Sequence, residues 1–389
     1  MSRPPKLPPP KRCCGCAACH DACPAAAIRM VPDVEGFSRP FIDAAQCLGC
    51  GRCGMVCPVL HPGEARSPVS VRAVKSRDDA IRLASSSGGV FSLLSTRVLE
   101  RSGVVYGVAF DPEDGRIRHV RVTSSDGLSP LRGSKYVQSD AAGVYRAVLS
   151  DIRAGRPVLF SGTPCQIAAM RRCVGGSVAH LLLCEIVCMG VSSPLAFKTY
   201  LAAIDPGRNV RSVSFRSKRV GWKHFSMELF SSDGVFHSET LRVDPYLKGM
   251  LARLFLRPSC SSCPFRGLRS GADVTLGDFW NVHRRFPDMD DDRGTSLVLA
   301  STERGETAIC DILPVCDYRE TNWLHAIEIN PALVRSKPTN SRRTVFFRCV
   351  GKENFVSLVA RLTRPPAWKR MTKTVVSFVS RTIRKMKEP

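Results

Sequence analysis

The sequence lacks any apolar stretch long enough to cross a membrane. A membrane-spanning helix needs ~20 consecutive apolar residues, and even the segment 181–191 is interrupted by Glu185. An apolar leader is missing too, because residues 1–12 read MSRPPKLPPPKR. We therefore expect the 18 cysteines to lie in a reducing cytoplasm and not in a secreted disulfide framework.

Acidic side chains are also scarce. The chain of 389 residues has 34 Asp and Glu against 57 Lys and Arg, which leaves a net charge of +23. A basic surface suits acidic redox proteins, phosphorylated cofactors and anionic lipid. The sequence has no recognised nucleic-acid-binding motif, so nucleic acid is the least favoured partner.

Two identical cysteine runs near the N-terminus carry most of the information. Each reads C-x2-C-x2-C-x3-C-P, and the runs end at Pro24 and Pro58. This spacing is typical of bacterial two-cluster ferredoxins, in which three closely spaced thiolates hold one iron-sulfur cube and the fourth crosses to the other. It predicts two [4Fe-4S] clusters, one on Cys13, Cys16, Cys19 and Cys57 and the other on Cys47, Cys50, Cys53 and Cys23.

Structural zinc and disulfides are the alternatives for so many cysteines. Zinc sites usually pair two C-x2-C units across a longer loop, and disulfide frameworks belong to small secreted chains. Neither explains two four-cysteine runs that each end in proline. Cys14 falls outside the spacing and is expected to have no ligand role. The runs therefore predict a protein that moves electrons.

Beyond a linker at 61–69 the pattern changes to alternating strands and helices. A strand that starts at Val71 precedes a helix that starts near Gly88, and a buried strand at 158–160 leads into another helix. This repetition favours a mixed α/β body, of the α+β class, behind the ferredoxin-like module. Further strands are predicted at 104–111, 117–123, 180–187, 213–219, 226–231, 235–240, 275–280 and 296–301, and helices at 141–153 and 244–256.

Four further cysteines stand at turns beside predicted strand ends. Cys260 and Cys263 form a C-x2-C pair followed by proline, and Cys165 and Cys188 could complete a set of four. The alternative is that the two lone cysteines are small packed hydrophobes, as most free cysteines are. The remaining cysteines lack ligand spacing and are predicted to lie in the core: Cys173, Cys184, Cys310, Cys316 and Cys349.

Two short motifs suit a phosphorylated cofactor. SSSGGVF (85–91) places glycines and hydroxyls at a helix start, where backbone amides can bind a phosphate. An ordinary Ser/Gly helix cap is the alternative. GSKYVQS (133–139) supplies Lys135 for a phosphate and Tyr136 as a ring to stack on a flavin.

Taken together, the motifs carry a resemblance. In chain order the two cysteine runs, SSSGGVF, GSKYVQS, GTPCQ, VCMGVSSP, FRSKRVGW, LRPSCSSCPF and LGDFW resemble the coenzyme F420 hydrogenase/dehydrogenase beta-subunit family over about 13–300. One departure is Met189, which stands where the family usually has a histidine after the cysteine. The resemblance therefore gives no support for a proton-handling role at that position.

The resemblance implies an iron-sulfur flavoprotein oxidoreductase with a flavin-binding, two-part body. Such a protein passes electrons between [4Fe-4S] clusters and FAD, and on to or from a soluble hydride carrier such as coenzyme F420. It implies a redox partner protein, either a ferredoxin or a hydrogenase or dehydrogenase subunit. It also implies a third cluster on Cys165, Cys188, Cys260 and Cys263, and flavin contacts from Ser87, Gly88, Gly89, Ser134 and Lys135.

Related members of the family act on other substrates, and some lie in polysaccharide gene sets with no assigned reaction. Two alternatives therefore stay open. The chain could act on an unidentified substrate, for example in polysaccharide biosynthesis, or it could be a non-catalytic electron-transfer or scaffold subunit.

The chain is expected to divide into five segments. They are a flexible tail (1–12), the ferredoxin-type domain (13–60), regions resembling the N-terminal (71–150) and C-terminal (151–312) parts of the family body, and a basic extension (313–389). Residues 361–389 hold nine Lys or Arg against the single acid Glu388, and apolar residues recur there at three- and four-residue steps. This predicts a basic amphipathic helix over 366–387, which either lies on the anionic inner membrane surface or packs on the body.

Overall fold

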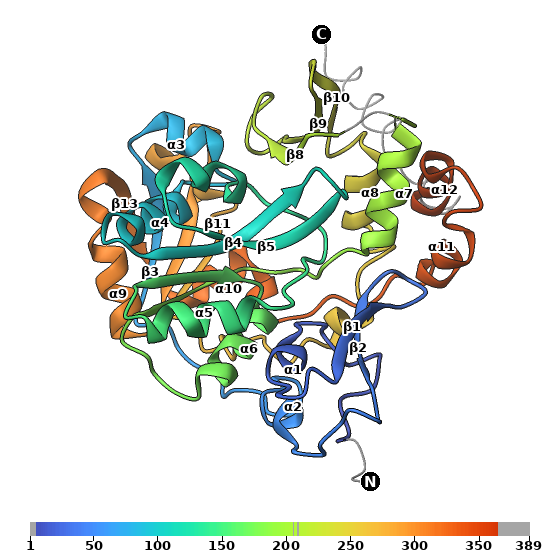
Figure 1. Ribbon diagram of the computed structural model, residues 1–389. Coiled ribbons are helices and arrows are strands. Elements are labelled where there is room, and N and C mark those ends of the chain that lie inside the picture. The colour runs from blue at the N-terminus through green and yellow to red at the C-terminus, as the bar shows by residue number, and fades with distance from the viewer. Residues whose placement is uncertain (1–4, 205, 208–209, 365–389) are drawn as a thin grey trace.

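The computed structural model describes residues 5–204, 206–207 and 210–364. Within them the chain forms an eight-stranded, a three-stranded and a two-stranded sheet. Figure 1 shows the largest sheet at the centre of the body, the three-stranded sheet at one end and the small N-terminal module at the other. The fold is therefore a mixed α/β body with a ferredoxin-type domain at its N-terminus, as the sequence predicts.

The eight-stranded sheet has a parallel centre. In sheet order its strands are β13 (Cys316–Thr321), β3 (Ser70–Ser76), β12 (Ser296–Ala300), β11 (Val274–Asp278), β7 (Leu181–Ile186), β6 (Val158–Gly162), β4 (Val104–Asp111) and β5 (Arg116–Val122). Strands β11, β7, β6 and β4 run parallel, and the outer strands pair antiparallel. The carboxyl ends of the parallel strands meet at one edge, where open α/β sheets bind their ligands.

Helices cover both faces of this sheet because successive residues of a strand point to opposite sides. On one side Val105 and Leu159 pack with helix α4 (Val90–Glu100), and helix α9 (Glu303–Cys310) adds to the same core. On the other side Val104 and Phe160 pack with helices α5 (Val144–Arg153) and α6 (Pro164–Val174). Both cores are fully covered, which explains why these strands read as continuous apolar runs.

A third, aromatic core lies beside the sheet. It joins the three-stranded sheet to four helices, and rings such as Phe197, Tyr246 and Phe255 fill it. Its elements are α7 (Pro194–Ile204), β8 (Ser212–Ser217), β9 (Ser226–Ser231), β10 (Gly234–Thr240), α8 (Pro245–Leu251), α11 (Arg343–Cys349) and α12 (Phe355–Thr363). The remaining helices of the body are α3 (Asp79–Ala84) and α10 (Trp323–Ile329), with short 3-10 turns η1 (Ser125–Leu131), η2 (Pro258–Ser262), η3 (Val282–Arg284), η4 (Pro287–Met289), η5 (Leu313–Val315) and η6 (Pro331–Leu333).

The N-terminal module packs tightly on the body. It consists of α1 (Ala18–Asp21), β1 (Ile28–Pro32), β2 (Ser38–Ile42) and α2 (Arg52–Met55). The buried carboxylate of Asp21 accepts hydrogen bonds from the backbone amides of Gly143, Tyr145 and Arg146, at 2.7, 2.9 and 3.3 Å. These amides belong to the first turn of α5, whose dipole also favours a negative charge. One module side chain therefore caps a helix of the body.

Some elements differ from the sequence-based expectations. Helices α3, α7, α9, α10, α11 and α12 were not predicted, and the helix expected over 244–256 ends at Leu251. Strand β13, which falls in the expected C-terminal extension, pairs with β3 at the edge of the main sheet. Cys310, predicted to lie in the core, is exposed because it ends the surface helix α9.

Two membrane-related observations remain. The amphipathic helix predicted over 366–387 lies outside the described residues. Among the residues that are described, none of the helices has the length and apolar character needed to cross a membrane.

The cap made by Asp21 gives a testable consequence. Asp21→Ala should lower the free energy of unfolding by about 2 kcal/mol, because charge-assisted hydrogen bonds from buried amides are lost. The apparent Tm and the rate of proteolytic cleavage between module and body would report the change. Asp43→Ala is the matched control, since that carboxylate accepts a hydrogen bond from Ala45 N in an exposed turn. Equal behaviour of the two variants would contradict the docking role.

Candidate functional site

The cysteines of the two runs surround two neighbouring hollows in the N-terminal module. The first hollow is lined by Cys23, Cys47, Cys50 and Cys53, and the second by Cys13, Cys16, Cys19 and Cys57 together with Cys14. Each hollow thus combines three cysteines of one run with the last cysteine of the other. This is the grouping that the spacing predicts for two cubes.

The thiols of the second hollow interact strongly. Burial, and then the charges of Cys13 and Cys57, raise the pKa of Cys19 to about 12. No group of three or more His, Cys, Asp or Glu side chains within the described ranges is arranged to hold a single metal ion. A cube differs from a single ion because each thiolate binds a different iron, so its ligands need not converge on one point.

Both loops use the same backbone conformation. Gly15 and Gly49 occupy the same place in their runs and have φ of 67° and 66°, while Ala17 and Gly51 match at 68° and 73°. Left-handed residues turn the chain sharply between successive cysteines and are followed directly by the single-turn helices α1 and α2. The repeated sequence spacing thus becomes a repeated loop.

The other four candidate ligands lie at or near the carboxyl edge of the main sheet. Cys165 stands three residues after β6, and Cys188 stands two residues after β7. Burial, followed by the charge of Cys260, raises the pKa of Cys188. Burial, with a smaller effect of Cys165, raises the pKa of Cys263. The fold therefore brings together Cys165, Cys188, Cys260 and Cys263 from three separate segments.

Cys14 connects this third set to the second hollow. The neighbouring thiol of Cys16, together with burial, raises the pKa of Cys14, whereas the thiol of Cys165 lowers it. Cys57 is part of a small buried cluster against which Cys14, Cys165 and Cys263 pack. The sequence suggested no role for Cys14, because it lies outside the ligand spacing.

The predicted flavin residues Ser87, Gly88 and Gly89 lie where β3 and β12 meet α4. The amide of Gly88 donates to Ser296 Oγ at 2.9 Å, and Ser87 Oγ donates to the carbonyl of Thr295 at 2.8 Å. A β-carbon on Gly88 would stand 2.2 Å from the carbonyl oxygen of Val74. Close backbone packing is therefore enough to require glycine at position 88.

The second predicted motif meets the first through two hydroxyls. Ser134 Oγ lies 2.8 Å from Ser86 Oγ. Lys135 is directed elsewhere, since its ammonium donates to the carbonyls of Pro130 and Arg132 at 2.6 Å each. Burial lowers the pKa of Lys135 to about 7. In this structure the Lys135 ammonium therefore stabilises the end of the turn η1.

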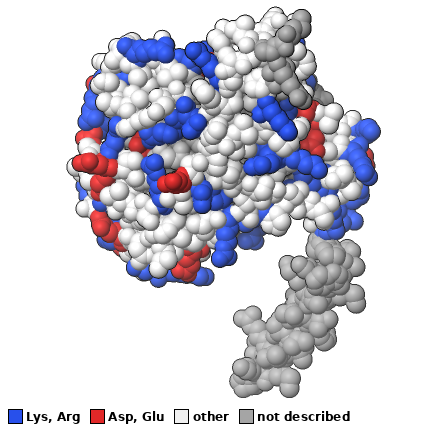
Figure 2. Space-filling model, turned by 90° about the horizontal axis from the view of Figure 1, so that it is seen from below, with Lys and Arg blue, Asp and Glu red and all other residues white. Residues whose placement is uncertain are grey.

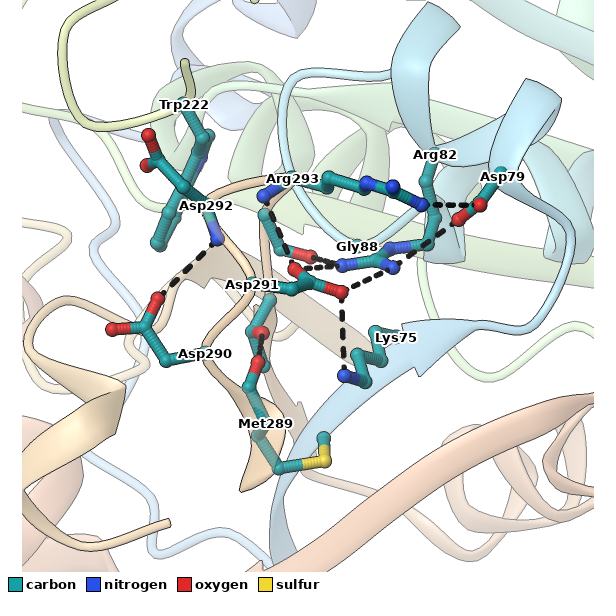
Figure 3. A network of polar contacts seen from close by, with 12 residues as sticks. Lys75, Asp79, Arg82, Gly88, Trp222, Met289, Asp290, Asp291, Asp292 and Arg293 are labelled. Carbon is teal, nitrogen blue, oxygen red and sulfur yellow. Dashed lines mark hydrogen bonds and ion pairs between the residues drawn. The ribbon is translucent and has the colours of Figure 1, made fainter. Parts of the chain in front are cut away.

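An ion-pair network supports this region (Figure 3). Arg82 makes a two-pronged contact with Asp291, at 2.8 and 2.6 Å, and also donates to the carbonyl of Gly294. Lys218 Nζ donates to the carbonyls of Ser87 and Arg293, at 2.8 and 2.7 Å. The network fixes the loop after η4 against the SSSGGVF turn.

A buried arginine among aromatic rings completes the site. Arg216 Nη1 donates to Asp278 Oδ2 at 2.6 Å, and its guanidinium lies over the rings of Phe225 and Trp280. Arg216 Nε and Nη2 and Asp278 Oδ1 are buried without a hydrogen-bond partner within the described part of the chain. Trp222 stacks on Trp280 with centroids 5.0 Å apart. Such unpaired donors beside flat rings suit a planar, polar ligand.

This arginine site joins the other motifs. Trp222 Nε1 donates to the carbonyl of Ser86 at 3.1 Å, and Ser86 contacts Ser134. The end of β11 also borders the third cysteine set, because Val187 N donates to the carbonyl of Leu276 at 2.8 Å. The segments FRSKRVGW and LGDFW thus supply Arg216, Trp222, Asp278 and Trp280, whose individual roles the sequence did not assign. The available signal was a tryptophan and a charged residue in each segment.

Comparisons with known proteins agree with these features. Residues 155–316 match the family model for the C terminus of the coenzyme F420 hydrogenase/dehydrogenase beta subunit, and residues 12–60 match the 4Fe-4S dicluster domain. Both matches confirm the resemblance drawn from the motifs.

Two individual proteins are also similar. The ferredoxin-type protein NapF of Haemophilus influenzae is 43% identical over 44 residues, which cover 11% of this chain and 25% of NapF. The chain thus spans about a quarter of the length of this relative. A chain in the F420-reducing [NiFe] hydrogenase complex from Methanosarcina barkeri is 17% identical, with a TM-score of 0.46, over 76% of this chain and 91% of that one.

The packing of Gly88 can be tested directly. Gly88→Ala should destabilise the fold by about 1–3 kcal/mol, because the new methyl group overlaps the backbone of β3. The loss should appear in urea unfolding even when no flavin has been added. Gly176→Ala is the control, since nothing lies within 4 Å of its β-carbon position. An unchanged midpoint for Gly88→Ala would show that the position is not constrained by packing.

Proposed function

Because the chain joins a 4Fe-4S dicluster domain to a coenzyme F420 hydrogenase/dehydrogenase beta-subunit region, we propose that it is an iron-sulfur flavoprotein oxidoreductase. It passes electrons between [4Fe-4S] clusters and FAD, and on to or from a soluble hydride carrier such as coenzyme F420. Its coarse class, an iron-sulfur electron-transfer protein of the oxidoreductase type, follows from the two family matches alone.

The observation that carries the proposal is the succession of cysteine sets. The first hollow opens at the surface, where Cys50 is exposed. The second hollow reaches the third set through Cys14 and Cys165. The third set borders the end of β11, where Asp278 and Arg216 lie. Electrons would therefore travel from the module surface to the carboxyl edge of the sheet.

The exposed end of this succession suits a redox partner protein. Leu48 and Met55, which flank Cys50, are 66% and 60% exposed. Figure 2, seen from the module's end of the molecule, shows Lys and Arg scattered over this face, with fewer Asp and Glu among them. A small apolar contact within a basic surrounding favours an acidic partner such as a ferredoxin or another subunit.

The residues at the carboxyl edge fit FAD in part. When bound, FAD supplies the exchange between hydride transfer and single-electron transfer. Arg216 offers two buried donors without partners, Trp222 and Trp280 offer a ring surface, and Ser134 offers a hydroxyl. Of the predicted contacts, the Gly88 amide and the Lys135 ammonium already have protein partners. We therefore propose that Arg216 carries more of the cofactor binding than Lys135.

The assignment of ligands to the two hollows predicts paired behaviour of cysteine variants. Anaerobically prepared protein should hold about eight irons, or about twelve with the third set. Cys57→Ala and Cys13→Ala should each lose about four irons and leave the same residual EPR spectrum, because they empty the same hollow. Cys23→Ala and Cys47→Ala should form the second matching pair. If Cys57→Ala instead matched Cys47→Ala, the crossed assignment would be wrong.

The flavin site predicts a separable loss. Arg216→Leu should release most of the flavin while iron content stays unchanged, because the buried donors lie outside the cysteine sets. Arg219→Leu is the control, since Arg219 lies two residues after the same strand and its side chain is 64% exposed. Flavin fluorescence after denaturation measures the content. Wild-type protein with clusters but without flavin would favour the non-catalytic electron-transfer or scaffold subunit.

The carrier can be tested with the same preparation. Protein reduced anaerobically should reduce coenzyme F420, which is followed by the loss of its visible absorbance. An unchanged trace with flavin present would contradict F420 as the carrier and favour an unidentified substrate.

A further inference from the structure

We propose that Arg257 sets the reduction potential of the cluster in the second hollow. Its buried guanidinium stabilises the reduced, more negative state of that cluster and so raises the potential. The inference rests on the proposed assignment of Cys13, Cys16, Cys19 and Cys57 as ligands, and it gives a function to the arginine that precedes the C-x2-C pair of LRPSCSSCPF.

Arg257 lies at the junction of module and body. It is 1% exposed and stands just before the turn η2 of the body. Its Nε donates to the carbonyl of Cys13 at 2.9 Å, and its Nη2 donates to the carbonyl of Ser38 at 3.0 Å. The same Nη2 lies 4.0 Å from Cys13 Sγ, which is the outer limit of a hydrogen bond to sulfur. The guanidinium therefore contacts both the backbone and the thiol of a candidate ligand.

Among the residues that the structure describes, no carboxylate neutralises this cation. Within the described ranges, Arg257 makes no ion pair, and its third acceptor is the neutral amide oxygen of Gln138 at 2.8 Å. The other buried arginines at comparable sites are paired, as Arg343 is with Glu35 and Arg216 is with Asp278. A buried charge without a partner is strongly unfavourable. A [4Fe-4S] cube with four thiolates is a net anion, and it supplies the missing counter-charge.

The surroundings hold the guanidinium in place. Gly15 has a φ of 67°, and a β-carbon there would stand 2.6 Å from Arg257 Nη1 and 2.5 Å from Gln138 Nε2. The ring of Phe37 lies 5.2 Å from the guanidinium carbon and is completely buried. The glycine between the first two ligand cysteines thus leaves room for the arginine as well as turning the loop.

Arg257 also connects two cysteine sets. The amide of Cys260 donates to the carbonyl of Arg257 at 3.1 Å, so the arginine stands directly between the second hollow and the third set. Reduction adds one negative charge to a cluster, and in a water-poor junction a cation at this range favours the reduced form. A raised reduction potential would make the cluster of the second hollow an acceptor for electrons that enter at the exposed cluster.

The experiment compares three variants of the full chain in an EPR-monitored redox titration. In Arg257→Gln, the equilibrium constant for one-electron reduction of one cluster should fall about tenfold, a shift of about 59 mV to lower potential. The cluster of the exposed first hollow should keep its potential. Arg257→Lys retains the charge and should stay within about twofold of the wild type.

Arg343→Gln is the matched control for loosened docking. Arg343 is also a buried arginine at the junction, and it pairs with Glu35 of the module, but its hydrogen bonds do not reach a cysteine. It should lower stability without changing any potential. An equal shift in Arg343→Gln, or none in Arg257→Gln, would overturn the proposal.

A second measurement covers the case in which Arg257→Gln fails to retain its iron. Pulsed EPR of the reduced wild type, grown with isotope-labelled arginine, should show a nitrogen coupling to one cluster that Arg257→Lys lacks. Absence of this coupling would overturn the role of Arg257. Absence of any cluster signal in the wild type would instead overturn the proposed function.

Discussion

The structure depends on a few buried polar contacts that fix the ferredoxin-like module to the body. Asp21 caps α5, the Arg343–Glu35 pair makes a second junction contact, and Arg257 makes a third. These contacts remove charged groups from water, so they are favourable only when the facing surfaces of the module and the body fit together accurately. Because of them the second hollow faces the body, while the first hollow remains at the surface.

The second organising feature is the shared carboxyl edge of the parallel strands. Cys165, Cys188 and Asp278 come from distant parts of the chain, yet each follows or ends a parallel strand of one sheet. The carboxyl edge therefore brings the third cysteine set close to the buried Arg216–Asp278 pair, although no single sequence motif contains both. Electron carriers and a cofactor site can lie close together there because every strand arrives in the same direction.

The sequence predicted the local features well, because local chemistry determines them. The cysteine spacing indicated two crossed ligand sets, and the apolar runs located β4, β6, β7 and β12 within one or two residues. It missed α3, which is too short to show a helical period. It also missed β13, because most residues of this edge strand are at least partly exposed and it lacks a continuous apolar run. Contacts that depend on tertiary structure were not accessible. Arg257, Arg216 and Cys14 each lie in a motif that the sequence marks, but their surroundings form only when distant segments meet.

The glycine motif shows how the same residues support two explanations. Gly88 was predicted as a phosphate contact, and the structure shows a backbone approach that requires glycine for packing alone. Ser134 and Ser86 still bring the two motifs together, and Arg216 provides the unpaired donors beside them. The unpaired polar groups that suit a ligand therefore lie near the ends of β8 and β11.

The most direct test of the account is EPR spin quantitation of the anaerobically purified, dithionite-reduced protein. The account predicts at least two unpaired spins per chain, with signals broadened by magnetic interaction between neighbouring [4Fe-4S] clusters. Fewer than two spins per chain, or metal analysis that finds zinc in place of iron, would contradict it.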